Sequence, residues 1–333
     1  MKPTTITLFL ALFVLYFNVK AQKSDEQLRQ QADQLAHKYI LTDGHVDLPY
    51  RLKIKNFRLE REYLGIPIST EEGDFDYERA KKGGLSAPFM SIYIPSSYQQ
   101  TGGAKQLADT LINMVRGIAT AHPDKFAIAT TPQQVDANFK KGLISFPMGM
   151  ENGAPLLELS DVAYFRKRGI SYVTLTHGKD NHICDSSYDT TYTHKGLSAY
   201  GREVVKEMNR VGIMVDISHV SDDSFYQAIE LSKVPVIASH SSCRHFTPTF
   251  KRNIGRHDQA TRQKRGVIQI NFGSSFLDEN YRQQAEVLQA KFGKILKEKG
   301  LKFSDPAARE LLKQFQKRKP RVVCRCRNRS RPH

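Results

Sequence analysis

The sequence predicts an α/β protein, a (β/α)8 barrel of the TIM type that is incomplete at its C-terminal end. Seven short apolar runs recur along the 333 residues, and segments of helical character separate them. The runs are nearly continuous in apolar and β-branched residues, which is typical of parallel strands covered on both faces. Strand and helix alternating through seven strands indicate a parallel barrel. A doubly wound open sheet is the alternative fold.

Residues 1–21 have the pattern of a cleavable secretion signal. A lysine near the start precedes the apolar run 6–17, and small residues stand where a signal peptidase reads, in Val19-Lys20-Ala21. The run is shorter than the ~20 residues that cross a bilayer comfortably. We therefore expect a secreted or periplasmic protein without stable membrane insertion after cleavage. An uncleaved anchor is the alternative.

The predicted barrel domain covers residues 22–312. It opens with a polar helix at 24–38, and the first strand is expected at 39–41. The six further strands are predicted at 88–94, 144–150, 170–175, 212–217, 234–238 and 266–272. Helices between them are predicted at 104–121, 197–210 and 221–231. Ser221 suits the N-cap of the last helix because two aspartates follow it.

Side chains that can bind a metal follow five of these strands. His45 and Asp47 come after the first strand and point to the same side, because they are two residues apart in an extended segment. The others stand one per strand end, after the third to sixth strands: Glu151, His177, His219 and His240. Each alone is more readily a loop histidine or a solvated carboxylate. Because the carboxyl ends of barrel strands meet on one face, the set predicts a metal centre.

The composition of this set indicates how many metal ions it binds. Even three of its four histidines, together with the aspartate and the glutamate, are too many ligands for one open zinc site, and they suit two ions bridged by a carboxylate. Glu151 is the natural bridge because it is the only glutamate among them. A nitrogen-rich set favours zinc over magnesium or calcium. The sequence therefore predicts two zinc ions per chain.

The motifs around these residues resemble a known family. They are Gly44–Asp47, Gly149–Gly153, Leu175–His177, Val215–His219 and Ser239–Ser242. In order and spacing they resemble the membrane (renal) dipeptidase family of zinc peptidases, whose bacterial secreted branch looks closest. The resemblance runs from about residue 36 to about residue 276, and the set is highly specific. It implies a two-zinc barrel enzyme that hydrolyses dipeptides, often with a D-residue at the C-terminal position.

The resemblance also implies which residue binds which ion. His45 and Asp47 are expected to hold one zinc ion. His219 and His240 are expected to hold the other, and Glu151 to bridge the two.

Two further residues are expected to contact the dipeptide substrate. His177 matches the family's substrate-contacting histidine, which is expected near the developing oxyanion and is the catalytic candidate of this chain. Arg252 resembles the arginine that pairs with the substrate carboxylate, which a guanidinium can grip in bidentate fashion. A sister metal hydrolase of the amidohydrolase or phosphotriesterase kind is the alternative enzyme. It usually carries a metal-bridging lysine where this chain has His177.

The C-terminal part departs from the family pattern. The family normally continues with an eighth strand ending in a Gly-Ser-Asp-Phe-Asp-Gly-like motif, whose aspartate is the acid–base, and this sequence has no such motif. Residues 313–333 are basic and lack an amphipathic period. Residues 255–265 stand where a barrel helix belongs, yet Ala260 is their only apolar side chain. Both stretches look like translation out of the ancestral frame. We therefore expect impaired hydrolysis, with a non-catalytic zinc-binding remnant as the alternative.

The distribution of charge bears on the partners. The net charge is +16, and residues 313–333 alone hold nine Lys and Arg and no acid. Residues 255–265 and the leader 1–21 hold most of the remainder, so the folded body is nearly neutral and no nucleic-acid partner is expected. A basic arm for nucleic acid or membrane is the alternative for the tail. A barrel without its last strand exposes two edges, and a homodimer is one way to cover them.

Overall fold

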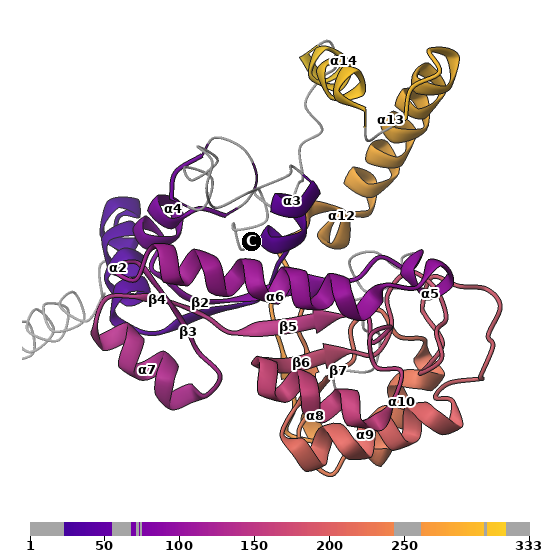
Figure 1. The fold of residues 1–333 in the computed structure, drawn as a ribbon. Helices are drawn as coiled ribbons and strands as arrows, with labels where there is room; N and C mark the ends of the chain where they lie inside the picture. The colour runs from indigo at the N-terminus through magenta and orange to yellow at the C-terminus, as the bar shows by residue number, and fades with distance from the viewer. Residues whose placement is uncertain are drawn as a thin grey trace, which may run out of the picture.

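The chain folds around one curled parallel sheet (Figure 1). The structure, a computed structural model, describes residues 23–54, 68–70, 73, 75–242, 261–302 and 305–317. The strands of this sheet are β1 (Leu41–Val46), β2 (Leu85–Tyr93), β5 (Met148–Glu151), β6 (Ile170–Thr174), β7 (Met214–Asp216), β8 (Ile237–Ala238) and β9 (Val267–Ile268). They pair in this order, and every pairing is parallel. Because the order follows the chain without the reversal of a doubly wound sheet, the barrel type of α/β fold is confirmed.

The third predicted strand, 144–150, is divided in the structure. Its first part, β4 (Ile144–Phe146), pairs with β3 (Phe126–Ile128) in a separate two-stranded sheet. Its second part is β5 of the main sheet. Pro147 lies at the division and has no N–H to donate to a ladder, while its carbonyl accepts a hydrogen bond from the Met90 N–H. The prediction of one continuous strand here is wrong.

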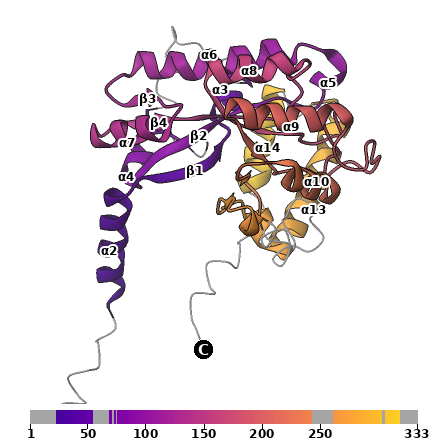
Figure 2. The same cartoon turned by 90° about the horizontal axis from the view of Figure 1, so that it is seen from below.

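Some of the helices cover the outer face of the sheet. The helices of the described residues are α2 (Asp25–Lys38), α3 (Leu48–Ile54), α4 (Tyr77–Lys82), α5 (Tyr98–Thr101), α6 (Ala104–Ala121), α7 (Pro132–Lys140), α8 (Leu159–Arg168), α9 (Ala199–Val211), α10 (Asp222–Leu231), α12 (Ser274–Leu277), α13 (Glu279–Glu298) and α14 (Pro306–Lys317). Figures 1 and 2 show α6, α8, α9 and α10 following one another over that face. The predicted helix 104–121 is confirmed with the same bounds. Ser221 caps α10 as predicted, because its hydroxyl accepts the Ser224 N–H at 3.2 Å.

Tyr172 of β6 fills the interior of the curled sheet. It is fully buried, and its ring lies over its register partner Gly149 on β5, where an added Cβ would overlap the ring. Only glycine leaves room for the ring at this position. The Tyr172 hydroxyl donates a hydrogen bond to the Gly44 carbonyl of β1 at 2.9 Å. One aromatic side chain therefore ties three strands together.

The last two helices form their own small core. Phe292 and Leu296 of α13 pack with Ala308 of α14, apart from the main hydrophobic cluster. Phe315 joins them, with its ring centroid 5.4 Å from that of Phe292. In Figure 1 this pair of helices stands away from the sheet. Helix α14 continues across the predicted domain boundary at 312/313, because Phe315 still has an apolar partner.

The free edges of the main sheet are β1 and β9. Within the described residues, no eighth strand joins them. No helix in the same part of the chain is long and apolar enough to cross a membrane. The predicted leader 1–21, most of the segment 255–265 and residues 318–333 lie outside the described residues.

Candidate metal centre

The Glu151 carboxylate lies at the centre of a cluster of imidazoles. Glu151 is the last residue of β5, and its side chain is 5% exposed. Its Oε2 atom lies 3.2 Å from His45 Nε2. Its Oε1 atom lies 3.0, 3.2 and 3.4 Å from the Nε2 atoms of His219, His240 and His177. The carboxyl ends of five strands thus bring these predicted site residues to one point, as the barrel geometry requires.

Asp47 lies at the margin of this cluster. Its Oδ1 atom is 3.3 Å from His45 Nε2, and its side chain is 57% exposed. The structure therefore places the His-x-Asp pair on one side of an extended segment, as the sequence predicts, with the carboxylate open to solvent.

Two groups of candidate ligands share the Glu151 carboxylate. They are His45–Glu151–His240 and Glu151–His177–His219, and within each group the ligand atoms lie within 4.8 Å of one another. A carboxylate common to both groups is what the predicted bridge between two ions requires. These groups place His240 with His45, whereas the resemblance pairs His240 with His219. The division of ligands between two ions stays a prediction.

His177 is the most accessible imidazole of the cluster. Its side chain is 23% exposed, against 5–14% for the other three. Its ring meets the edge of Tyr93, with centroids 4.9 Å apart, and faces Tyr188 at 6.2 Å. An imidazole at the open side of the centre can reach a ligand that enters from solvent. Arg252, the other predicted substrate contact, lies outside the described residues.

Unusual backbone conformations accompany two positions of the centre. His219 has φ +66° and Asn152, directly after Glu151, has φ +79°. Such left-handed conformations are uncommon for residues other than glycine and persist where the surroundings hold them. The Asn152 side chain donates to the Ile94 carbonyl at 3.0 Å, and the His219 carbonyl accepts the Ser187 N–H at 2.8 Å. These contacts fix the backbone that aims Glu151 and His219 inward.

Burial and charge together set the protonation of the centre. Burial raises the pKa of Glu151, but the charge of His45 and hydrogen bonds from His219 and His240 outweigh it, and this pKa lies well below its usual range. Burial lowers the pKa of His45, yet Tyr172 and Glu151 raise it to well above its usual range. For His219, burial and the charge of His240 lower the pKa. The buried carboxylate stays ionised and attracts a positive charge, which a proton or a metal ion can supply.

The donor set fits a divalent ion such as zinc. Nitrogen and oxygen ligands about 2.0–2.1 Å from a tetrahedral zinc lie roughly 3.3 Å from one another. The Glu151 oxygens lie 3.0–3.4 Å from the four Nε2 atoms, and His219 Nε2 is closer to His240 Nε2, at 2.5 Å. His219 Nδ1 is buried and has no hydrogen-bond partner within the described part of the chain. Imidazole and carboxylate ligands are those that zinc uses, and the spacing around Glu151 fits zinc, whereas the His219–His240 pair would have to move apart by several tenths of an ångström to share an ion.

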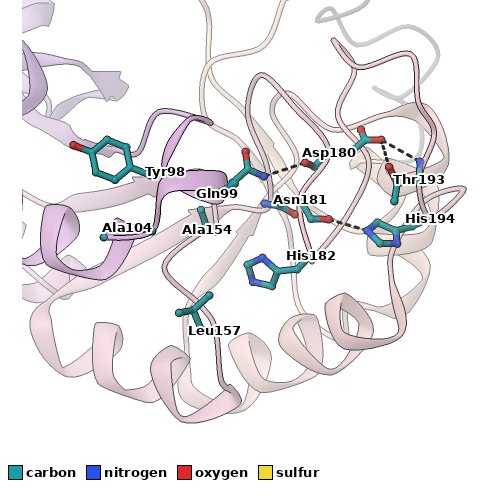
Figure 3. Close-up of a pocket in the computed structure, with 12 residues that line it drawn as sticks. Tyr98, Gln99, Ala104, Ala154, Leu157, Asp180, Asn181, His182, Thr193 and His194 are labelled. Atoms are coloured by element: carbon teal, nitrogen blue, oxygen red, sulfur yellow. Dashed lines mark hydrogen bonds between the residues drawn. The ribbon is translucent and has the colours of Figure 1, made fainter.

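A cavity of about 440 Å³ lies apart from these ligands, between α5, the start of α6 and the loop 180–194 (Figure 3). His182 and His194 line it, but the Nε2 atom of each bonds a backbone carbonyl, that of Leu156 at 2.7 Å and that of Asn181 at 2.8 Å. These two histidines hold the loop in place.

The sequence did not single out the polar side chains behind the ligands. Tyr172, Asp216 and Ser239 are almost fully buried and contact the ligand histidines or each other. Asp216 was visible as the one ionisable residue inside the apolar run 212–217. A charged side chain in a strand buried on both faces needs a buried partner. The presence of an aspartate in this run is therefore the sequence feature that indicates a buried polar network around Asp216.

A parallel α/β barrel with histidines and carboxylates at the carboxyl ends of its strands is the architecture of barrel metallohydrolases. Residues 29–303 match the family described as membrane dipeptidase (peptidase family M19). The chain belongs to this family.

Curated relatives and solved structures agree with this assignment. An uncharacterized dipeptidase of Schizosaccharomyces pombe is 33% identical in an alignment that covers 72% of this chain and 61% of that protein. Dipeptidase 3 of Rattus norvegicus is 33% identical over 66% of this chain and 45% of its own length. The chain thus spans about half to three fifths of these relatives.

Two crystal structures share the fold. The probable dipeptidase PvdM from Pseudomonas aeruginosa superposes with a TM-score of 0.68 at 22% identity, over 81% of this chain and 70% of that chain. A metallo peptidase from Rhodobacter sphaeroides, liganded with a phosphinate mimic of L-Ala-D-Ala, has a TM-score of 0.64 at 25% identity, over 72% of this chain and 76% of its own.

Proposed function

We propose that the chain is a dipeptidase that binds two zinc ions. The observation that carries the proposal is the Glu151 carboxylate, buried between four imidazoles and common to both groups of candidate ligands. His45 and Asp47 would hold one ion, His219 and His240 would hold the other, and Glu151 would be the ligand common to both. Membership of the dipeptidase family supports dipeptides as the substrate class.

When bound, paired zinc ions lower the pKa of water and polarise a carbonyl group. The protein side of the reaction falls to two residues. His177, the most exposed imidazole of the centre, donates a hydrogen bond to the scissile carbonyl oxygen as negative charge develops there. Arg252 pairs with the free carboxylate of the dipeptide. Together these contacts orient a short substrate whose C-terminus lies close to the bond that is cleaved.

We also propose that turnover by residues 1–333 is impaired. The sequence contains no Gly-Ser-Asp-Phe-Asp-Gly-like motif, which would supply the aspartate that transfers a proton to the leaving amine. A positioned acid–base group typically contributes about 10²–10⁴-fold to the rate. The same absence favours the second candidate function, a zinc-binding remnant that does not turn over.

The leader and the exported location are part of the same proposal. Residues 1–21 direct secretion and are removed, which puts the mature chain outside the cytoplasm. Expression with the leader followed by N-terminal sequencing tests this, and a secreted chain that still begins at Met1 would contradict it.

The test of function combines zinc content with hydrolysis. Leaderless protein is dialysed against zinc, its metal content is measured by mass spectrometry, and L-Ala-D-Ala is the assay substrate. Glu151→Gln removes the bridging charge, and Glu203→Gln removes an exposed carboxylate of α9 as the matched control. We expect two zinc ions per chain, fewer in Glu151→Gln, and no change in Glu203→Gln.

The outcomes separate the candidates. Two zinc ions with measurable hydrolysis support the dipeptidase. Two zinc ions without hydrolysis support the remnant. A folded chain that holds no zinc refutes both, and hydrolysis of a phosphotriester in place of a dipeptide supports the sister class of metal hydrolase.

A further inference from the structure

The ring nitrogens that face away from Glu151 lie against a buried network of hydroxyl groups. His45 Nδ1 is 3.0 Å from the Tyr172 hydroxyl, which in turn is 2.9 Å from the Gly44 carbonyl oxygen. A carbonyl oxygen only accepts, so the single hydroxyl proton of Tyr172 goes to Gly44. The Tyr172 oxygen is then left to accept a proton from His45 Nδ1. With Nδ1 protonated, Nε2, the atom that faces Glu151, is the nitrogen whose lone pair becomes available to a metal ion once Nε2 gives up the proton that it shares with the carboxylate.

His240 has an equivalent arrangement built from different residues. Its Nδ1 atom is 2.7 Å from Ser239 Oγ, and Ser239 Oγ is 2.6 Å from Asp216 Oδ2. The carboxylate accepts the serine proton, so Ser239 Oγ accepts from His240 Nδ1. Nε2 of His240, 3.2 Å from Glu151 Oε1, is again the nitrogen that becomes available to a metal ion once it gives up its proton.

Asp216 is fixed as an acceptor by its surroundings. It is fully buried at the end of β7. Five donors point at its carboxylate: the hydroxyls of Thr174 at 2.5 Å, Ser239 at 2.6 Å and Ser218 at 2.9 Å, and the backbone N–H groups of Ser239 at 3.0 Å and Ser218 at 3.2 Å. Both Asp216 oxygens accept hydrogen bonds from these donors. A protonated Asp216 would find no acceptor among these five groups for its own proton. Such a network holds its members in one orientation.

We propose that Asp216, acting through Ser239, and Tyr172 are positioning residues that select Nε2 as the metal-binding nitrogen of His240 and His45. This rests on the proposed function, because it assigns one of the two histidines to each zinc ion. The hydrogen bonds hold the rings in the tautomer protonated on Nδ1, so the ligand lone pairs are directed at the bridge. Outer contacts of this kind typically change metal affinity by about 10–100-fold.

Five substitutions separate a positioning role from a role in general packing. Ser239→Ala and Tyr172→Phe each remove one oxygen of the network and keep the rest of the side chain. Ser232→Ala and Tyr200→Phe are matched controls, because each removes a buried or half-buried hydroxyl that bonds a backbone carbonyl elsewhere, at Val234 and Leu156. Ser239→Thr keeps a hydroxyl and serves as the conservative rescue.

Zinc affinity is measured by competition with a chromophoric chelator, and cobalt spectra report the ligand field of each site. We expect Ser239→Ala and Tyr172→Phe to weaken one of the two zinc sites by about 10–100-fold. We expect Ser232→Ala, Tyr200→Phe and Ser239→Thr to bind zinc as the unaltered chain does. Equal zinc affinity and equal cobalt spectra in Ser239→Ala, Tyr172→Phe and their controls would overturn the proposal.

A second measurement does not depend on metal binding. Nitrogen-15 spectra of the histidine side chains in chelator-treated protein, recorded from neutral to alkaline pH, show which ring nitrogen keeps its proton. We expect protonated Nδ1 for His45 and His240, and loss of this preference in Tyr172→Phe and Ser239→Ala respectively. Protonated Nε2 on both histidines overturns the positioning proposal. An unaltered chain with protonated Nδ1 that binds no zinc refutes the proposed function alone.

Discussion

Replacing Gly149 with alanine tests the packing that supports the centre from inside the sheet. A methyl group on residue 149 of β5 would overlap the ring of Tyr172. The ring has little room to yield, because Tyr172 is fully buried and lies against Phe89, with centroids 5.4 Å apart. Its hydroxyl is also held between Gly44 and His45. Either the strands move apart or the hydroxyl leaves its partners.

The size of the effect follows from these contacts. Overpacking of a well-packed core costs about 1–3 kcal/mol. If the ring moves, the two hydrogen bonds of the Tyr172 hydroxyl are lost, at about 1 kcal/mol each. We therefore expect Gly149→Ala to lower the free energy of unfolding by about 1–5 kcal/mol. For a domain of this size, each 1 kcal/mol corresponds to roughly 2–4 °C in Tm.

Thermal melts followed by circular dichroism measure this change, and zinc competition on the same samples measures the centre. Gly293→Ala is the matched control, because Gly293 lies inside α13 and an added Cβ would meet no atom within 4 Å. That control should be neutral or stabilising, since alanine favours a helix by about 0.5–1 kcal/mol over glycine. A Gly149→Ala protein that melts with the parent and binds zinc equally would refute this reasoning.

Three other predictions concern the core, acid stability and metal removal. Leu111→Ala, at a fully buried position of α6, should cost about 2–5 kcal/mol in denaturant unfolding, whereas Leu157→Ala, at a residue 67% exposed, should cost little. Burial raises the pKa of Asp161, but Lys105 at 2.5 Å and backbone N–H groups lower that pKa overall. The Asp161 carboxylate therefore stabilises the folded protein fully at pH values above its pKa in the unfolded chain, and this stabilisation is lost as the pH falls through its lower pKa in the folded protein. Asp161→Asn should therefore destabilise at pH 7 and flatten the acid limb of a pH series, and parallel curves would contradict this. Chelation should lower Tm, because zinc at 100 times its Kd contributes about 2.7 kcal/mol; an unchanged Tm would argue against zinc bound to the folded state.

Periodicity and strand ends predicted much of this molecule. The apolar run 170–175 identified β6, because a strand buried on both faces is apolar throughout. The amphipathic segment 104–121 identified α6, because a helix buried on one face has apolar residues at a helical period. Histidines and carboxylates directly after apolar runs identified the centre, because parallel strands end on one face. These inferences need only the order of residue types along the chain.

Other features depend on contacts that the order of residues does not encode. The division at Pro147 reflects two sheets that compete for one apolar run, and β3 had too short a run to be seen. Helix α14 passes residue 312 because Phe315 finds Phe292 across a helix pair. The hydrogen-bond network of Asp216 joins residues from β6, β7 and the turn after β8, and no local pattern reveals that they meet.

The metal centre also brings together strands from opposite ends of the sheet. Within the described residues β1 pairs only with β2, and β8 lies near the other end of the sheet. Yet the His45 and His240 rings stack with centroids 3.8 Å apart, and Gly44 passes so close to the Ser239 carbonyl that a Cβ there would overlap it. The curl therefore brings β1 against the end of β8 without strand pairing. The contacts between the two are made by side chains and by the close approach of Gly44 to Ser239, and the Tyr172 hydroxyl, which bonds the Gly44 carbonyl, adds a side-chain link from β6 to β1.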